Sequence, residues 1–265
     1  MSNVLPSREA MITIGTVAAV TVMVLLIMLE YKFTIRMLLI GAMSALATLP
    51  GGIFGELVRK LTYGEWNTFV SDFSQYEGTH YLGRTIYTIC VGFLLWQIIM
   101  RKHTGTFAKE GRSRFLDVLS VFMLIQIVAG RIGCISNGCC VGKTYYGALS
   151  IYNTDLGCRV YPAVHTELII SLITLAIVIA LYAKRKNAFA AFCIGYSIAL
   201  FIAECMYDST GTVKILGLTV VQLLSVAVLV TGIIYSYIFG HSTAEYIKNN
   251  KTCGNKLPQK RRKSL

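Results

Sequence analysis

The stretch GRIGCISNGCCVG, residues 130–142, places an arginine, an asparagine and three cysteines directly after the apolar run FMLIQIVA. An arginine guanidinium donates two parallel hydrogen bonds to a phosphate and stays charged when it is partly buried. The four glycines of the stretch disfavour a regular helix and let backbone amides approach a ligand closely. An asparagine side chain adds both a donor and an acceptor. We therefore predict a ligand cavity formed by Arg131, Gly133, Asn137, Gly138 and Gly142.

Six further ionisable residues interrupt apolar stretches, and they are Glu56, His80, Arg84, His165, Glu167 and Glu204. A charge within the hydrocarbon of a bilayer costs about 2.5–3.5 kcal/mol even on the most lenient scale, so each is a candidate functional group. His80 and Arg84 are four residues apart and share one helix face, so both can address one ligand. The alternative is a set of structural ion pairs between helices, such as Arg84 or Arg131 with Glu204. Asp117 can reach the membrane interface at the entry of its helix.

The elements that position these groups are predicted to be membrane helices. The chain is 55% hydrophobic and 14% charged, whereas soluble domains carry about 25% charged residues. A helix of roughly 20 apolar residues spans a bilayer, and its backbone satisfies its own hydrogen bonds. We predict an all-α, polytopic membrane protein with one transmembrane domain, residues 1–246, and a basic cytoplasmic tail, residues 247–265. The seven predicted helices cover residues 11–29, 37–54, 80–100, 115–137, 165–183, 187–205 and 215–240. A proline kink is expected in LATLPGG, residues 46–52.

Basic residues concentrate in alternate loops and in the tail KLPQKRRK. The positive-inside rule makes that face cytoplasmic, so the N-terminus lies outside and the C-terminus inside, as an odd number of helices requires. With these helix directions, all seven ionisable residues fall in the outer half of the membrane. The tail is interpreted as a topology and anionic-lipid signal rather than a nucleic-acid site.

Four cysteines, Cys134, Cys139, Cys140 and Cys158, fall at or beyond the outer end of the fourth predicted helix, where oxidation is possible. We favour a disulfide among them over a metal site, because C-x4-C-C lacks the C-x2-C spacing of structural zinc. Other interpretations are small buried apolar side chains or a thiol that transiently carries a diacylglyceryl group. No metal is predicted.

With Arg131 and its glycines in view, the chain resembles the prolipoprotein diacylglyceryl transferase family. The family signature begins Gly-Arg-Ile-Gly, and here GRIG is followed by Asn137, Gly138 and Gly142. Three weaker matches fall in the family's order. The segment GTHYLGR resembles a histidine-glycine segment at the start of helix three, VHTEL resembles a His-Pro-Thr-Gln-Leu segment at the start of helix five, and LFIAECMYD resembles the end of helix six.

The resemblance covers most of the chain and implies seven membrane helices in a bacterial cell membrane. It implies transfer of the diacylglyceryl group of phosphatidylglycerol to a lipobox cysteine in the signal peptide of a preprolipoprotein, with release of glycerol phosphate. His80 would act as the base, Arg131 and Arg84 would stabilise the leaving phosphate, and Glu204 would complete the catalytic set. The other substrate-binding residues would be Gly133, Asn137, Gly138, Gly142, His165 and Glu167, and no cofactor is implied.

The sequence departs from the family pattern at several positions, and the proline of the helix-five segment is missing in VHTEL. Cys134 and Cys139 replace an asparagine and a glutamate of the signature, Leu200 replaces an arginine, and Glu167 replaces a glutamine. We expect Arg84 to compensate for the missing arginine. Two rival functions are a non-catalytic protein that binds phospholipid or lipopeptide, and a transferase with another acceptor. A transporter is disfavoured because the charges lie in one leaflet. A light-driven receptor is disfavoured because residues 215–240 contain no lysine.

Overall fold

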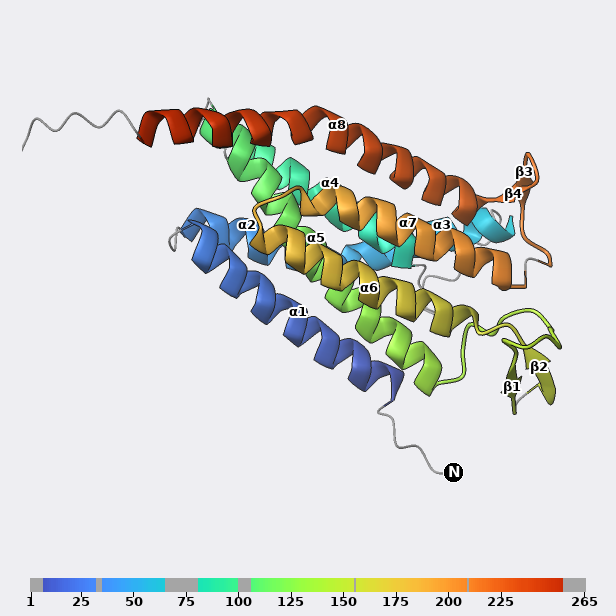
Figure 1. The fold of residues 1–265 in the computed structure, drawn as a ribbon. Coiled ribbons are helices and arrows are strands. Elements are labelled where there is room, and N and C mark those ends of the chain that lie inside the picture. Colours follow the sequence, from blue (N-terminus) through green and yellow to red (C-terminus); the bar gives the residue numbers. More distant parts are fainter. Residues whose placement is uncertain are drawn as a thin grey trace, which may run out of the picture.

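The protein is a bundle of helices with two small β-hairpins at one end (Figure 1). The computed structural model describes residues 7–31, 35–64, 81–99, 106–154, 156–208 and 210–254. The helices are α1 (Arg8–Tyr31), α2 (Ile35–Leu46), α3 (Thr48–Tyr63), α4 (Tyr81–Ile99), α5 (Thr106–Ser136), α6 (Ala163–Ala183), α7 (Ala188–Met206) and α8 (Val220–Gly254). The strands are β1 (Ile151–Asn153), β2 (Cys158–Val160), β3 (Lys214–Ile215) and β4 (Leu218–Thr219).

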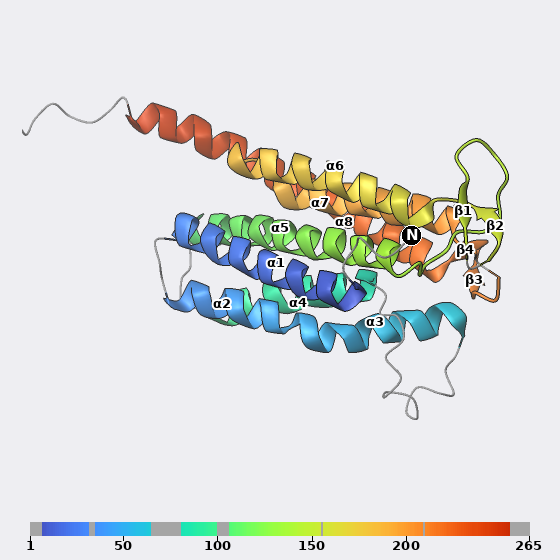
Figure 2. The same ribbon diagram turned by 90° about the horizontal axis from the view of Figure 1, so that it is seen from below.

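Helix α5 is the centre of the bundle, and it contacts α1, α4, α6 and α7. Helices α2, α3 and α4 lie on one side of α5, and α6, α7 and α8 lie on the other (Figure 2). Every residue from 115 to 124 is buried. Phe115 stacks on Trp96 of α4 with ring centroids 5.4 Å apart, and in α7 Phe192 stacks on Tyr196 at 5.7 Å. The first contact fixes how α4 rotates against α5, whereas the second lies within α7.

Six helical segments of the described chain are long and apolar enough to cross a membrane, namely Ala10–Glu30, Leu39–Tyr63, Arg112–Ser136, Ala163–Ala183, Ala188–Met206 and Val220–Ile238. The shorter apolar helix Leu82–Ile98 corresponds to the third predicted span. Large apolar side chains such as Leu29 and Ile98 point outward, 80% and 70% exposed, as expected where lipid surrounds the helices. The protein is therefore a mostly helical, multi-pass membrane protein, and the count of seven spans stays a prediction.

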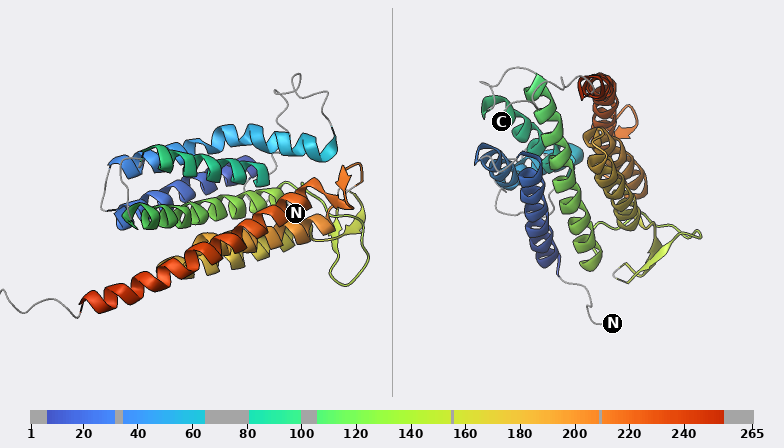
Figure 3. Two further views of the ribbon diagram at one scale, coloured as in Figure 1. Left: turned by 90° about the horizontal axis from the view of Figure 1, so that it is seen from above. Right: turned by 60° about the vertical axis from the view of Figure 1, so that its left-hand side comes forward.

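The start of α1 and the end of α8 lie at opposite ends of the bundle (Figures 1 and 3). Both hairpins lie at the same end as the start of α1, which we call the hairpin end. An odd number of crossings would give this arrangement. The predicted orientation, with the N-terminus outside, remains a prediction.

The predicted interruption in residues 46–52 is present as the break between α2 and α3 at Ala47. Pro50 has no N–H to donate to the carbonyl of Leu46, so the helical hydrogen-bond ladder loses one link there. The backbone bonds on either side are kept, from Ala47 N to Met43 O at 2.9 Å and from Gly51 N to Ala47 O at 3.1 Å. The two helices therefore form one kinked, membrane-length segment.

The structure corrects the all-α prediction at the connections between helices. Antiparallel β1 and β2 pair Ile151 with Val160, and antiparallel β3 and β4 pair Lys214 with Thr219. The last membrane helix consequently begins at Val220 rather than at residue 215. The alternation of residues 214–219 is too short to distinguish a hairpin from the start of an apolar helix.

Asp117 was expected to reach the membrane interface. It is instead buried within the protein and only 1% exposed. Its Oδ1 accepts hydrogen bonds from the backbone N–H groups of Ala188 at 2.9 Å and Phe189 at 2.8 Å. These N–H groups belong to the first turn of α7, where no helical partner exists for them. Arg114 approaches the same carboxylate at 3.4 Å and pairs with Glu30 of α1 at 3.2 Å. Asp117 thus joins α5 to α7 at the end of the bundle opposite the hairpins.

We predict that Asp117→Ala lowers the free energy of unfolding by about 3 kcal/mol, because two buried N–H groups lose a charged acceptor. Thermal unfolding of the purified protein in detergent, followed by circular dichroism, measures the loss. The control is Asp208→Ala, since Asp208 is exposed and its carboxylate bonds to Thr210, two residues along the chain. Equal stability of the two variants would contradict the capping role.

Candidate active site at the hairpin end of the bundle

Arg131 and Glu167 form a buried ion pair between α5 and α6. The Nε and Nη2 atoms of Arg131 each lie 2.7 Å from Oε1 of Glu167. Their side chains are 10% and 0% exposed. A buried charge is tolerated only when it is paired and hydrogen-bonded, because removal from water costs several kcal/mol per ion. The pair therefore fixes both the rotation of α6 against α5 and the direction of the guanidinium.

Tyr207 is a third member of this polar cluster. Its hydroxyl donates to Oε2 of Glu167 at 3.5 Å, so the two carboxylate oxygens have different partners. Burial raises the pKa of Tyr207, which keeps the hydroxyl protonated and able to donate. Gly142 forms a β-bridge with Tyr207, and the N–H of Lys143 donates to the carbonyl of Met206 at 2.9 Å. Residues 138–143, which follow α5 and which we call the signature loop, therefore position Tyr207 at the end of α7.

The glycines of the signature have different roles from those predicted. Gly130 and Gly133 lie within regular helix, since α5 runs on to Ser136, and the predicted break there is wrong. The packing of α5 on both sides outweighs the roughly 1 kcal/mol that each glycine costs in a helix. Gly138 ends the helix at φ 65°, where Cys139 N bonds to Cys134 O at 3.1 Å and Gly138 N bonds to Ile135 O at 3.2 Å. This is the Schellman arrangement, which favours glycine at the left-handed position.

Gly142 is needed because the loop passes very close to the chain that leads into α6. A Cβ at this position would lie 2.3 Å from the carbonyl oxygen of Tyr161, which no side chain permits. The same approach lets the N–H of Tyr161 donate to the carbonyl of Lys143 at 3.0 Å. The signature loop is thereby fastened to the β1–β2 hairpin and to the start of α6.

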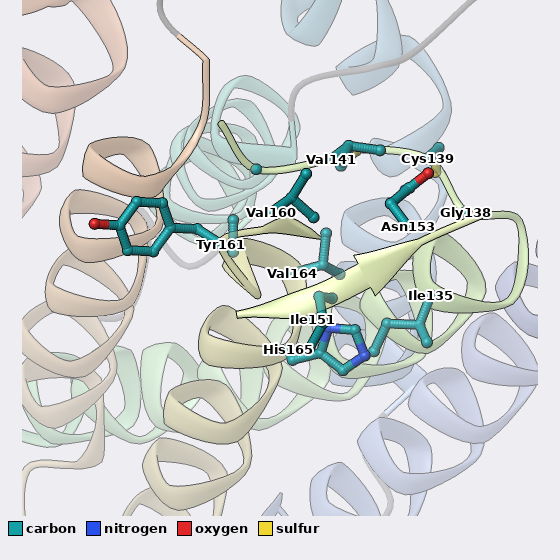
Figure 4. A pocket seen from close by; sticks show the side chains of 13 residues that line it. Ile135, Gly138, Cys139, Val141, Ile151, Asn153, Val160, Tyr161, Val164 and His165 are labelled. Atoms are coloured by element: carbon teal, nitrogen blue, oxygen red, sulfur yellow. The ribbon is translucent and has the colours of Figure 1, made fainter. Parts of the chain in front are cut away.

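A cavity of about 60 Å³ lies between the signature loop, the hairpin and the first turn of α6 (Figure 4). Residues 138–142 line it together with Ile151, Val160 and His165. The Nδ1 atom of His165 is buried and has no hydrogen-bond partner among the described residues. His165 and Glu167 are two residues apart, about 200° around the helix. This spacing turns Glu167 toward α5 while His165 faces the cavity.

Three of the four cysteines meet beside the cavity. The Sγ atoms of Cys134, Cys139 and Cys140 all lie within 4.8 Å of one another. Cys134, Cys139, Cys140 and Cys158 form no disulfide in the part of the chain that the structure describes, so the predicted disulfide is not present. Hydrogen bonding to the Cys134 and Cys139 thiols raises the pKa of Cys140. Cys134 lies one helical turn after Arg131, and the charge of Arg131 acts on Cys134 and on Cys140.

Glu204, Arg84 and Glu56 each have contacts of their own among the described residues. Glu204 accepts a hydrogen bond from the hydroxyl of Thr219 in β4 at 2.9 Å, and the structure pairs Arg131 with Glu167 instead. Arg84 packs its stem over Gly51 of α3, and it is not among the partners of Glu167. Glu56 pairs with Arg59 on the same helix at 2.7 Å. His80 lies outside the described residues, and the side chain of Asn137 is exposed.

Sequence reasoning did not single out Tyr207 as a member of the site, and it named Cys140 only as one of four cysteines at the outer end of the fourth predicted helix. Tyr207 falls within the quoted segment LFIAECMYD, but only the fold reveals its contact with Glu167. Cys140 has φ 62°, a left-handed conformation that is uncommon outside glycine. No spacing rule signals that this conformation turns its thiol toward Cys134.

We predict strong coupling between Arg131 and Glu167 in a double-mutant cycle. Arg131→Met and Glu167→Leu should each cost about 3–5 kcal/mol, because each leaves a buried charge without its partner. The double variant should cost much less than the sum. Denaturant unfolding in detergent measures all four proteins. The Glu56–Arg59 pair is the control. Because this pair is more exposed, its coupling free energy should be less than about 1 kcal/mol. Additive losses at Arg131 and Glu167 would contradict the pairing.

Comparison with known proteins identifies the family of the chain. A search of curated proteins finds no match. The family model described as prolipoprotein diacylglyceryl transferase matches residues 10–238, which includes every helix from α1 to most of α8 and the whole polar cluster. The buried Arg131 of the signature Gly-Arg-Ile-Gly lies within that match. The chain therefore belongs to the prolipoprotein diacylglyceryl transferase family.

Proposed function

We propose that the protein transfers the diacylglyceryl group of phosphatidylglycerol to the thiol of a lipobox cysteine in a preprolipoprotein. The family is one of transferases in lipoprotein biosynthesis. The observation that carries the proposal is the signature arginine, Arg131, which is buried, charge-paired and one helical turn before Ile135, which lines the cavity at one end of the bundle. Both proposed substrates are anchored in lipid, and a membrane protein can receive both.

The reaction forms one bond and breaks one. The sulfur of the acceptor attacks the glyceryl carbon that carries the phosphate ester. A carbon–sulfur bond forms as the carbon–oxygen bond breaks, and the electron pair leaves with glycerol phosphate. The thiol proton passes to a base, for which His80 remains the candidate because an imidazole titrates near neutral pH. His165 lines the cavity and is a second imidazole within the site.

Arg131 is suited to the charge that develops on the leaving phosphate. A guanidinium aimed by fixed contacts does not have to reorient as the negative charge grows, and such preorganised groups supply much of enzymatic catalysis. Glu167 holds the guanidinium from α6, and Tyr207 at the end of α7 holds Glu167 in turn. The surrounding apolar bundle excludes water, which would compete with the thiol as nucleophile.

The position of the missing family arginine, Leu200, is 5% exposed and belongs to the hydrophobic core. No cation can be supplied to the site from this position of α7. Arg84 of α4, whose stem packs over Gly51, stays our candidate for the second phosphate contact. The transfer rate of Arg84→Ala tests this role.

The direct test is complementation of a bacterial strain whose own transferase is under conditional control. The proposal predicts that the wild-type chain restores growth and that prolipoprotein gains the mass of one diacylglyceryl group. In vitro, a lipobox peptide should gain the same mass with phosphatidylglycerol vesicles but not with phosphatidylethanolamine vesicles. A purified protein that binds phosphatidylglycerol without any mass gain would overturn the enzyme and favour a lipid-binding protein.

We predict that Arg131→Ala abolishes transfer and that Arg84→Ala slows it by roughly 10²-fold, the usual loss when one donor to a developing charge is removed. The same mass assay measures both rates. Arg59→Ala is the matched control, because Arg59 is also a half-buried membrane arginine but is paired with Glu56. If Arg84→Ala transfers at the wild-type rate, Arg84 does not replace the missing arginine.

A further inference from the structure

The three-cysteine cluster of Cys134, Cys139 and Cys140 is not accounted for by the proposed reaction. Cys134 lies in the last turn of α5, the Schellman turn at Gly138 brings Cys139 back over it, and the left-handed Cys140 turns inward. All three Sγ atoms consequently lie within 4.8 Å of one another. Two of these cysteines replace residues of the family signature, and the third follows directly.

Three converging thiols are a ligand set for a thiophilic cation. Zn–S bonds are about 2.3 Å long, so sulfurs around a tetrahedral zinc lie roughly 3.8 Å apart. Small side-chain rotations would close the observed spacing to this value. A disulfide would use only two of the three sulfurs, whereas a zinc ion uses all of them. The sequence spacing C-x4-C-C argued against zinc. The turn at Gly138 nevertheless brings the three sulfurs together, which the spacing alone does not predict.

A zinc ion held by three protein ligands keeps a fourth position for water or substrate, as in catalytic zinc sites. Cys134 is buried, Cys139 is half-buried and Cys140 is exposed, so the cluster opens on one side. Cys139 and Cys140 also line the cavity next to His165. A fourth ligand can therefore reach the cluster from the cavity.

We propose that Cys134, Cys139 and Cys140 bind one Zn²⁺ ion whose fourth position takes the acceptor thiol as a thiolate. The binding of the acceptor thiol to the zinc ion rests on the proposed function. Binding of the ion releases the three cysteine protons to solvent, and the entering thiol displaces water and passes its own proton to the base of the proposed reaction, His80. A zinc-coordinated thiol is deprotonated outright. The bound sulfur then forms the carbon–sulfur bond, and the electron pair of the broken carbon–oxygen bond leaves with the phosphate.

Zinc binding is tested on the full-length protein in detergent, reduced, loaded with Zn²⁺ and dialysed. We expect one zinc per chain by elemental analysis and almost none in Cys134→Ser, Cys139→Ser or Cys140→Ser. Cys193→Ser is the matched control, since Cys193 is a buried thiol within α7. This variant should bind one zinc per chain, as the wild type does. Circular dichroism verifies that each variant is helical. Zinc that is absent from the wild type, or retained in all three cluster variants, overturns the site.

Two further measurements separate this inference from its alternatives. Co²⁺ in place of zinc should give sulfur-to-cobalt charge-transfer absorption, and a lipobox peptide, but not its Cys→Ser form, should change the spectrum. A mass lower by two hydrogens without reductant, together with no zinc binding after reduction, identifies a disulfide and overturns the proposal. Binding of Cu⁺ but not Zn²⁺ also overturns it.

The outcomes for zinc and for transfer are distinguishable. A protein that binds zinc through the three cysteines but transfers no lipid keeps the metal site and loses the proposed function. A protein that transfers lipid equally well after chelation, and in all three serine variants, keeps the function and loses the thiol-activating zinc.

Discussion

The ion pair of Arg131 and Glu167 is the interaction on which the organisation of the site depends. Two full charges between packed helices have to meet at hydrogen-bond distance, because neither is stable alone in an apolar bundle. This requirement fixes α6 against α5 more strictly than apolar packing does, since Leu and Ile faces tolerate small rotations. It also turns His165, two residues before Glu167, toward the cavity. One pair thus sets both the cation and the neighbouring imidazole.

The signature loop holds Tyr207 against the ion pair of Arg131 and Glu167. Gly138 ends α5, Gly142 passes against Tyr161, and the bridge to Tyr207 brings the tyrosine hydroxyl to Glu167. Each link uses backbone hydrogen bonds, which satisfy polar groups that would be costly at membrane depth. A loop that leaves the helix at a glycine and returns to the end of α7 therefore belongs to the site as much as Arg131 does.

The departures from the family pattern change the charge of the site: Leu200 and Glu167 make it less positive, whereas Cys139 in place of a glutamate removes one negative charge. A family arginine is lost at Leu200, and an acidic residue, Glu167, stands where the family has glutamine. Glu167 pairs with the remaining arginine, and the cysteines of the signature gather immediately beside it. The ion pair together with the thiol cluster gives this protein a site with more sulfur and less positive charge than the signature implies.

Sequence alone determined the properties that are local to each segment. A bilayer imposes its thickness on every span separately, so apolar length predicted the helices, and Pro50 and Gly138 marked breaks through their own backbone restrictions. The position of Arg131 near the end of α5 followed in the same way. Its partner did not, because Glu167 lies 36 residues further along the chain and Glu204 was an equally charged candidate. Which carboxylate meets Arg131, and which thiols meet one another, depends on helix rotation and loop return, and only the tertiary packing sets these.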